Sequence, residues 1–181
     1  MKKLICNVSV FDGHNAGLLE HGNILVEDNL VTESTQEPQD PRQFDAVIDG
    51  RGMTAIPGLI DCHIHMSATT SAAQRDMMRP DELAVRSVRF AHEMLMRGFT
   101  TVRDAGGLVY GLKASIDSGY TDGPRIYPSH AYLSQTCGHG DQRTNRAQGR
   151  DAFGSYPSPA MRSGETVICD GVPEVMRAVR E

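Results

Sequence analysis

Two histidines one residue apart, at the end of a short apolar run, constrain the fold of this chain more than any other feature. They close the segment 57–65, which begins with a Pro-Gly break, continues with Leu59 and Ile60, and ends with His63 and His65. Because side chains on a strand alternate with period two, both imidazoles should point to one side, beyond the carboxyl end of the strand. Neutral imidazole is a common ligand of zinc and suits several other divalent metals. The pattern predicts half of a metal site, the alternative being two packed or solvent-facing histidines.

Four stretches of the sequence, taken in order, resemble the signature of the amidohydrolase superfamily. They are PGLIDCHIH at 57–65, GFTTVRDAGG at 98–107, GPR at 123–125 and SQTCGHGD at 134–141. Together they resemble the branch that holds imidazolonepropionase-like enzymes and metal-dependent dipeptidases that cleave before a C-terminal Pro, Arg or Lys. The resemblance extends from Leu4 nearly to the last residue.

This resemblance implies hydrolysis of a C–N bond by a water that a divalent metal activates, with zinc as the expected metal and one or two ions. His63 and His65 would hold the more buried ion. In the superfamily the remaining groups follow later in the chain: a lysine carboxylated on its nitrogen from the fourth barrel strand, two histidines from the fifth and sixth, and an aspartate from the eighth. We therefore expect metal ligands but no catalytic residue within these 181 residues.

The length of the chain limits how much of such a fold it can hold. A complete eight-stranded barrel takes about 250 residues, and this chain has 181. We expect an α/β fold: the amino-terminal part of a (β/α)8 TIM barrel, with its first three βα units at 57–181, preceded by a partial β-sandwich-like domain at 1–56. Two protein ligands are fewer than the three usual at catalytic zinc, so the chain alone should be inactive.

The first 56 residues have the short runs and turns of a β domain. An edge strand is expected at 4–11 and a hairpin over 23–31, where Ile24-Leu25-Val26 and Leu30-Val31 flank a polar turn. The polar segment 34–42 with its two prolines indicates a loop. The apolar runs 46–48 and 53–56 then flank a second turn.

From residue 57 the pattern changes to alternating strands and helices, which is typical of parallel α/β folds. A helix is expected at 81–97, with a broad apolar face that includes Val85 and Met96, and a second helix near 108–118. Strands are expected at 100–104 and 125–131. A last helix should begin at Asp170 or Gly171, since Pro173 and Glu174 suit a first turn.

The end of the expected strand at 100–104 and the two glycines after it each allow two interpretations. Gly106-Gly107 could cradle a phosphate, but the full GxGxxG pattern is missing, so a tight turn is expected. Arg103 and Asp104 lie where barrel strands reach the active face. Their charges could serve that face, or they could equally satisfy each other or a loop.

The stretch 132–169 is rich in Gly, Ser, Pro and Arg, has no clear periodicity, and is expected to be a long loop. The resemblance gives His139 a substrate-binding role, the alternative being a loop histidine bonded to Asp141. Relatives often carry glycine where Cys137 stands. The four arginines of this stretch could pair with a substrate carboxylate, but solvated side chains are the favoured interpretation; they are Arg143, Arg146, Arg150 and Arg162.

The composition of the chain limits the kinds of partner that we expect for it. The net charge is -5 and no dense Lys/Arg stripe occurs, which argues against nucleic acid. No run approaches the roughly 20 apolar residues of a membrane helix, and polar residues interrupt the start that a signal peptide would need. The four cysteines, at 6, 62, 137 and 169, lack CxxC spacing, so reduced thiols and a cytoplasmic location are expected.

The leading hypothesis is a metal-dependent amidohydrolase acting on a small molecule, namely a dipeptide or an N-acyl amino acid. The nearest alternative opens a cyclic amide, as imidazolonepropionase-like enzymes do. A hypothesis of another class is an inactive, truncated product that needs a partner or the missing carboxyl-terminal part. Assembly into a homo-oligomer is left open.

Overall fold

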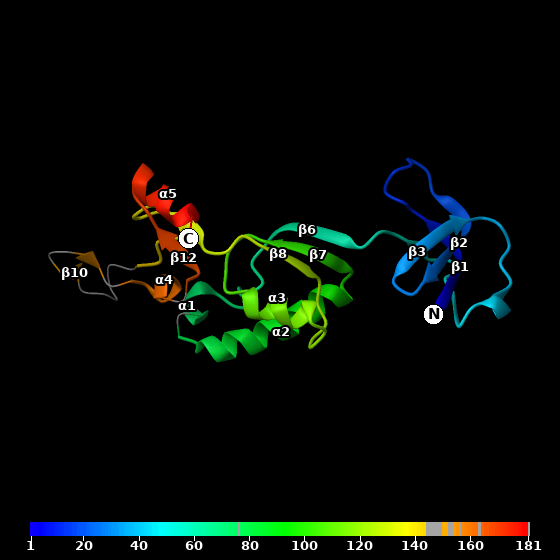
Figure 1. Cartoon of the computed structure of the whole chain (residues 1–181), viewed down its shortest axis with the longest axis horizontal. Coiled ribbons are helices and arrows are strands. Elements are labelled where there is room, and N and C mark those ends of the chain that lie inside the picture. Colours follow the sequence, from blue (N-terminus) through cyan, green and yellow to red (C-terminus); the bar gives the residue numbers. More distant parts are fainter. Residues whose placement is uncertain (76, 144–149, 152–153, 156, 163, 181) are drawn as a thin grey trace. The chain divides into compact units, whose positions relative to one another are not determined.

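The computed structural model describes residues 1–75, 77–143, 150–151, 154–155, 157–162 and 164–180 (Figure 1). Contacts along the chain divide it into two compact units, Met1–Pro57 and Gly58–Glu181. Each unit has a hydrophobic core of its own.

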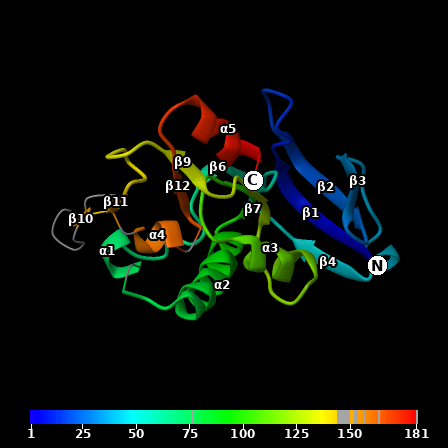
Figure 2. The same ribbon diagram turned by 60° about the vertical axis from the view of Figure 1, so that its left-hand side comes forward.

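The first unit is one five-stranded sheet. Its strands are β1 (Lys2–Val10), β2 (Leu19–Glu27), β3 (Leu30–Thr35), β4 (Ala46–Asp49) and β5 (Thr54–Ala55), and the short 3-10 helix η1 (Pro41–Gln43) precedes β4. The order is β3-β2-β1-β4, with β5 also paired to β1, and the strands β1 to β4 can be followed side by side in Figure 2. Val8, Val10 and Ile24 form its core.

The hairpin expected over 23–31 is formed by β2 and β3, but the expectation of an edge strand at 4–11 was wrong. β1 lies inside the sheet, antiparallel to β2 on one side and parallel to both β4 and β5 on the other. The two later runs therefore both pair with β1, an arrangement that local patterning does not show. All strands of residues 1–57 belong to this one sheet, so a second layer of the expected sandwich is absent from these residues.

The second unit begins with a parallel sheet in the order β6-β7-β8, formed by β6 (Leu59–Ile64), β7 (Phe99–Asp104) and β8 (Arg125–Pro128). The connections carry the helices α1 (Ala72–Arg75), α2 (Pro80–Met96) and α3 (Tyr110–Asp117). Figures 1 and 2 show α2 and α3 on the same face of this sheet. Three parallel strands with crossover helices are the start of an α/β layer, and the described residues do not close a barrel.

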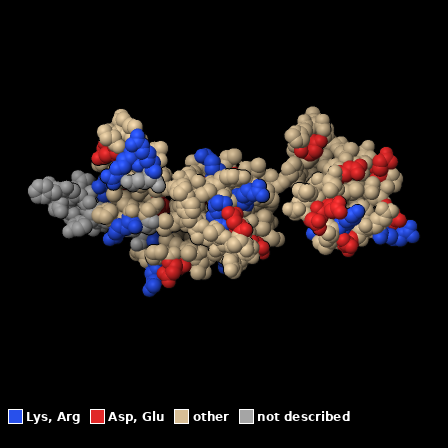
Figure 3. All heavy atoms as spheres, viewed as in Figure 1, with Lys and Arg blue, Asp and Glu red and all other residues tan. Residues whose placement is uncertain are grey.

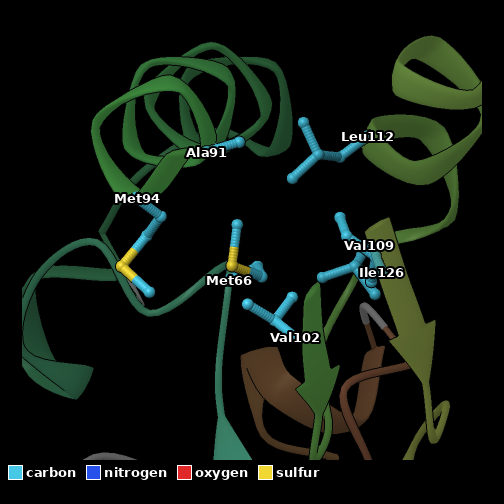
Figure 4. Packing of buried hydrophobic residues seen from close by; sticks show 7 residues of the cluster. All are labelled: Met66, Ala91, Met94, Val102, Val109, Leu112 and Ile126. Carbon is cyan, nitrogen blue, oxygen red and sulfur yellow. The ribbon is translucent and has the colours of Figure 1, made fainter. Parts of the chain in front are cut away.

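The core of this unit lies between α2, α3 and the sheet (Figure 4). Val102 and Ile126 from the strands are almost fully buried, and burial of such side chains stabilises the fold by roughly 1.5–3 kcal/mol each. The remaining buried members come from the helices and their connections: Met66, Ala91, Met94, Val109 and Leu112. The packing of α2 and α3 thus covers one face of the sheet. The carboxyl ends of its strands stay available for a site.

Helix α2 begins and ends within one residue of the predicted bounds. Pro80 at its first position and Asp81 and Glu82 in its first turn favour the start, and Gly98 follows its end with φ +94°. Its buried face agrees with the predicted apolar face only in part. Ser87, Ala91 and Met94 are buried, whereas Val85 and Met96 are exposed. Ser87 can be buried because its hydroxyl donates to the Leu83 carbonyl.

The expectation of one long loop at 132–169 was wrong. The described part of this stretch contains β9 (Tyr132–Ser134), β10 (Arg150–Asp151), β11 (Gly154–Ser155), the helix α4 (Pro159–Arg162) and β12 (Thr166–Ile168). β9 and β12 pair in parallel, and the helix α5 (Val172–Arg180) follows, beginning one residue after the predicted start. The pairing returns the chain to the end of β8, and this return forms one wall of the cavity described below.

On the face shown in Figure 3, the charged side chains of the first unit are mostly acidic, and in the second unit basic side chains gather over α5. Among the described residues, no helix has the length and apolar character needed to cross a bilayer.

Candidate metal and substrate site

His63 and His65 lie next to each other at the carboxyl end of β6. Their ring centroids are 5.5 Å apart, with an angle of 82° between the ring planes. The backbone N–H of His63 donates to the Asp61 carboxylate at 3.0 Å, and the register of β6 against β7 shifts between Asp61 and Ile64. Both rings line the same cavity, which has a volume of about 630 Å³.

The His65 ring is held by the backbone after β7. Its Nδ1 lies 2.8 Å from the Gly106 carbonyl oxygen, and because a carbonyl can only accept, Nδ1 carries the proton. The Nε2 atom of the neutral ring then keeps its lone pair for a metal. In metal-binding histidines, the N–H of the ring nitrogen that does not bind the metal usually donates a hydrogen bond in this way.

Gly106 and Gly107 form the tight turn that the sequence predicted. Their φ angles, +139° and +147°, favour glycine. A Cβ at Gly106 would lie 2.4 Å from the Tyr132 ring, and one at Gly107 would lie 2.3 Å from the Ser67 hydroxyl. The two glycines therefore let the turn pack closely against Tyr132 and Ser67.

Asp104 connects the two segments that place His65. It is fully buried, and its carboxylate accepts the Met66 N–H at 2.6 Å and the Gly106 N–H at 3.0 Å. One carboxylate thus joins the residue after His65 to the residue whose carbonyl holds the ring. Of the two interpretations given to Asp104, the structure shows the one in which it satisfies a loop.

Arg103, the other charged residue at this strand end, does not pair with Asp104. Its Nε donates to the Cys62 carbonyl at 2.6 Å, which ties β7 to β6 one residue before His63. Both charged residues thus stabilise the backbone around the two histidines.

A divalent metal fits the donors present. Two imidazoles line one cavity, and in His65 a backbone acceptor fixes the tautomer that leaves a nitrogen free, so both can serve as ligands. Within the described residues, no group of three or more His, Cys, Asp or Glu side chains is arranged to hold an ion. The described chain therefore offers two candidate ligands, fewer than a closed coordination sphere requires.

The third predicted site residue, His139, lines the same cavity as the two other histidines. It lies in the turn after β9. The acidic residue of this turn, Asp141, forms its hydrogen bonds with Arg143 and Cys137. The Asp141 carboxylate accepts hydrogen bonds from Nε and Nη2 of Arg143, at 2.5 and 2.6 Å, and from the Cys137 N–H, at 2.8 Å. The Arg143 guanidinium is the main cause that holds the pKa of the Asp141 carboxyl well below its usual range. Asp141 thus stabilises the turn that carries His139.

Cys137 lies in this turn in a left-handed conformation, with φ +61°. Glycine adopts that conformation without strain, whereas a residue with a side chain rarely does. The chain keeps the turn although a side chain is present, because the Cys137 N–H is held by Asp141 and the neighbouring Thr136 donates to Asp170 through its N–H, at 2.9 Å, and its hydroxyl.

The arginines of the stretch 132–169 differ in whether their side chains are solvated, as was expected for all of them. Arg143 is mostly buried and paired with Asp141, contrary to the favoured interpretation of a solvated side chain. Arg162 is exposed. Arg146 and the side chain of Arg150 lie outside the described residues.

Sequence reasoning missed four polar residues that line the cavity: Arg75, Tyr132, Gln142 and Glu165. Arg75 ends a four-residue helix and Glu165 precedes a three-residue strand, so neither belongs to a periodic pattern. Tyr132 could have been suspected, because it follows a strand that ends at the same edge as His65.

Comparison with known proteins gives consistent matches. A model of the amidohydrolase family matches residues 54–180. The chain is 32% identical to an ochratoxinase of Aspergillus niger over 177 residues, which covers 90% of this chain and 36% of the relative. The chain thus spans about a third of the length of this curated relative.

Two solved structures resemble the chain over 99% of its length. One is a prolidase complexed with N-methylphosphonate-L-proline, with a TM-score of 0.82 and 35% identity. The other is a Xaa-Pro dipeptidase with methionine bound in its active site, with a TM-score of 0.81 and 28% identity. The chain covers 43% of the first and 44% of the second.

Proposed function

The chain belongs to the amidohydrolase family, and from this premise we propose that its protein is a metal-dependent hydrolase of the amide bond in a dipeptide or an N-acyl amino acid. The observation that carries the proposal is the pair His63 and His65, which lines one cavity with the His65 ring fixed by the Gly106 carbonyl. The names of the similar proteins, a prolidase and a Xaa-Pro dipeptidase, support the substrate class.

In this proposal His63 and His65 hold a divalent ion, for which zinc is the favoured candidate because it readily binds imidazole nitrogen. When bound, such an ion polarises the scissile carbonyl and lowers the pKa of water from 15.7 towards about 7. The chain's own residues bind and orient the substrate. His139 and Gln142 offer polar groups to it, and the ring of Tyr132, 6.4 Å from that of His65 between centroids, forms a wall.

Partners and location remain proposals as well. We propose a small molecule or a dipeptide as the partner, no nucleic acid or membrane partner, and a cytoplasmic location.

The direct test is hydrolysis by the full gene product. A panel of dipeptides and N-acyl amino acids, with proline at the carboxyl end of some, is offered to the protein before and after dialysis against a chelator. We expect cleavage that is lost on chelation and returns with Zn²⁺. A protein that hydrolyses the panel equally well without metal, or that cleaves only cyclic amides, would contradict the proposal.

His139→Ala should impair the use of substrate without removing the metal. Because His139 lines the cavity but follows β9 rather than β6, we expect a higher KM or a lower kcat, by about 10- to 100-fold for a lost polar contact. Metal content by plasma emission should stay unchanged. His92→Ala, an exposed histidine on α2, is the matched control. Loss of metal in the His139 variant would show that the residue is a ligand instead.

A further inference from the structure

An ion pair between residues 90 positions apart lies in the wall of the cavity. Nη1 of Arg75, at the end of α1, donates to Oε1 of Glu165, just before β12, at 2.7 Å. The two side chains are 13% and 16% exposed. Both residues line the cavity that contains His63 and His65. This pair is thus much less open to solvent than the helix-surface pairs of the chain, such as Arg86 with Glu82 at 46% and 47%.

The Arg75 guanidinium has donors that the described residues do not fill. Its Nε is buried and has no hydrogen-bond partner among them. Buried donors without a partner are rare in native proteins. A guanidinium carries five N–H groups in a planar fork that matches a carboxylate, and it can join two carboxylates at once. Glu165 accepts a hydrogen bond from one of these nitrogens, Nη1, and the other N–H groups of a guanidinium that lines the cavity are the donors that an anion there could engage.

The charges of the cavity favour this assignment. Among the described residues that line it, Arg75 is the only guanidinium and Glu165 the only carboxylate, and the other polar members are histidines, Tyr132 and Gln142. A substrate carboxylate therefore has one strong partner in this wall. Glu165 would orient that partner and, as a like charge beside the ligand, weaken the binding of an anion.

We propose that Arg75 is a specificity-determining residue that binds the free carboxylate of the substrate, and that Glu165 holds Arg75 and limits that affinity. The inference rests on the proposed function, since it states which group of a dipeptide or an N-acyl amino acid the cavity recognises. The protein should then prefer substrates with a free carboxyl end over their amides.

The test uses two probes that differ only in that group, N-acetyl-L-proline and N-acetyl-L-prolinamide, titrated calorimetrically into the full gene product after dialysis against a chelator, so that binding is measured without turnover. We expect the acid to bind at least about 10-fold more tightly than the amide. Arg75→Gln should weaken binding of the acid by about 10- to 100-fold and leave the amide unchanged, because a charge-assisted hydrogen bond is lost. Glu165→Gln should strengthen binding of the acid several-fold. Arg75→Lys, which keeps the charge without the fork, should give an intermediate affinity.

Arg86→Gln, which breaks the exposed pair with Glu82, is the matched control and should change neither affinity. Equal losses for acid and amide in the Arg75 variants would show a structural role and overturn the inference, and so would weaker acid binding in Glu165→Gln. Binding without hydrolysis of the panel would contradict the proposed function alone. Hydrolysis without discrimination between acid and amide would contradict this inference alone.

Discussion

In the full gene product, replacement of both His63 and His65 by alanine is expected to remove the bound metal and to reduce turnover to the background rate. In the proposed function the two imidazoles are the metal ligands, and the described residues contain no group of three or more His, Cys, Asp or Glu side chains that could hold the ion instead. His63 is exposed and His65 only half-buried, so the free energy of unfolding of the metal-free protein should change by less than about 1 kcal/mol. Plasma emission measures the metal, and urea denaturation after chelation measures the stability.

The single variants make this expectation sharper. His65→Ala should cost more metal affinity than His63→Ala, because the backbone carbonyl of Gly106 fixes the His65 ring, whereas the described residues show no such contact for the ring of His63. His92→Ala again serves as the control. Unchanged metal content in the double variant would refute the assignment of both ligands.

The second large effect is expected at Asp104. Asp104→Ala leaves the buried N–H groups of Met66 and Gly106 without their acceptor, so we expect a loss of about 2–4 kcal/mol in the free energy of unfolding. Asp104→Asn keeps the size of the side chain but turns an amide donor towards one of these N–H groups. It should weaken metal binding by about 10- to 100-fold, as loss of an outer-shell partner typically does.

Two measurements separate these effects. Urea denaturation in chelator reports stability, and competition with a chelator of known affinity reports the metal dissociation constant of the folded protein. Asp81→Asn, in the exposed first turn of α2, is the matched control. A variant of Asp104 that loses stability but binds metal as tightly as the original protein would show that Asp104 does not position His65.

The parallel part of the fold could be predicted because its elements are local and periodic. α2 has a proline and two acids at its start and a glycine after its end, and these signals act within a few residues. The strands β7 and β8 follow Gly98 and Pro124; β7 begins one residue before the predicted 100–104, and β8 begins at the predicted residue 125 but ends at Pro128 rather than at 131.

The elements that were mispredicted depend on partners far along the chain. β9 and β12 are three residues each and pair across 34 positions, so neither has a periodicity to detect. β1 becomes a central strand only because β4 and β5 join it later. On α2, the exposed Val85 and Met96 are as apolar as the buried Met94, so the sequence alone could not show which face packs.

The residues of the candidate site also fall into those that the sequence could predict and those that it could not. The two strand-end histidines follow from a period of two, and His139 follows from the resemblance of its motif. The Arg75–Glu165 pair depends on a contact between two segments that have no pattern of their own, so only the folded chain shows it.

The acceptor that orients His65 belongs to the main chain, so no substitution at residue 106 can delete it. A side chain at 106 would disturb this arrangement in two ways, since it would strain a backbone held at φ +139° and would collide with the Tyr132 ring. Selection on this position should therefore act on the absence of a side chain rather than on the presence of one. In related sequences, glycine should therefore recur at position 106.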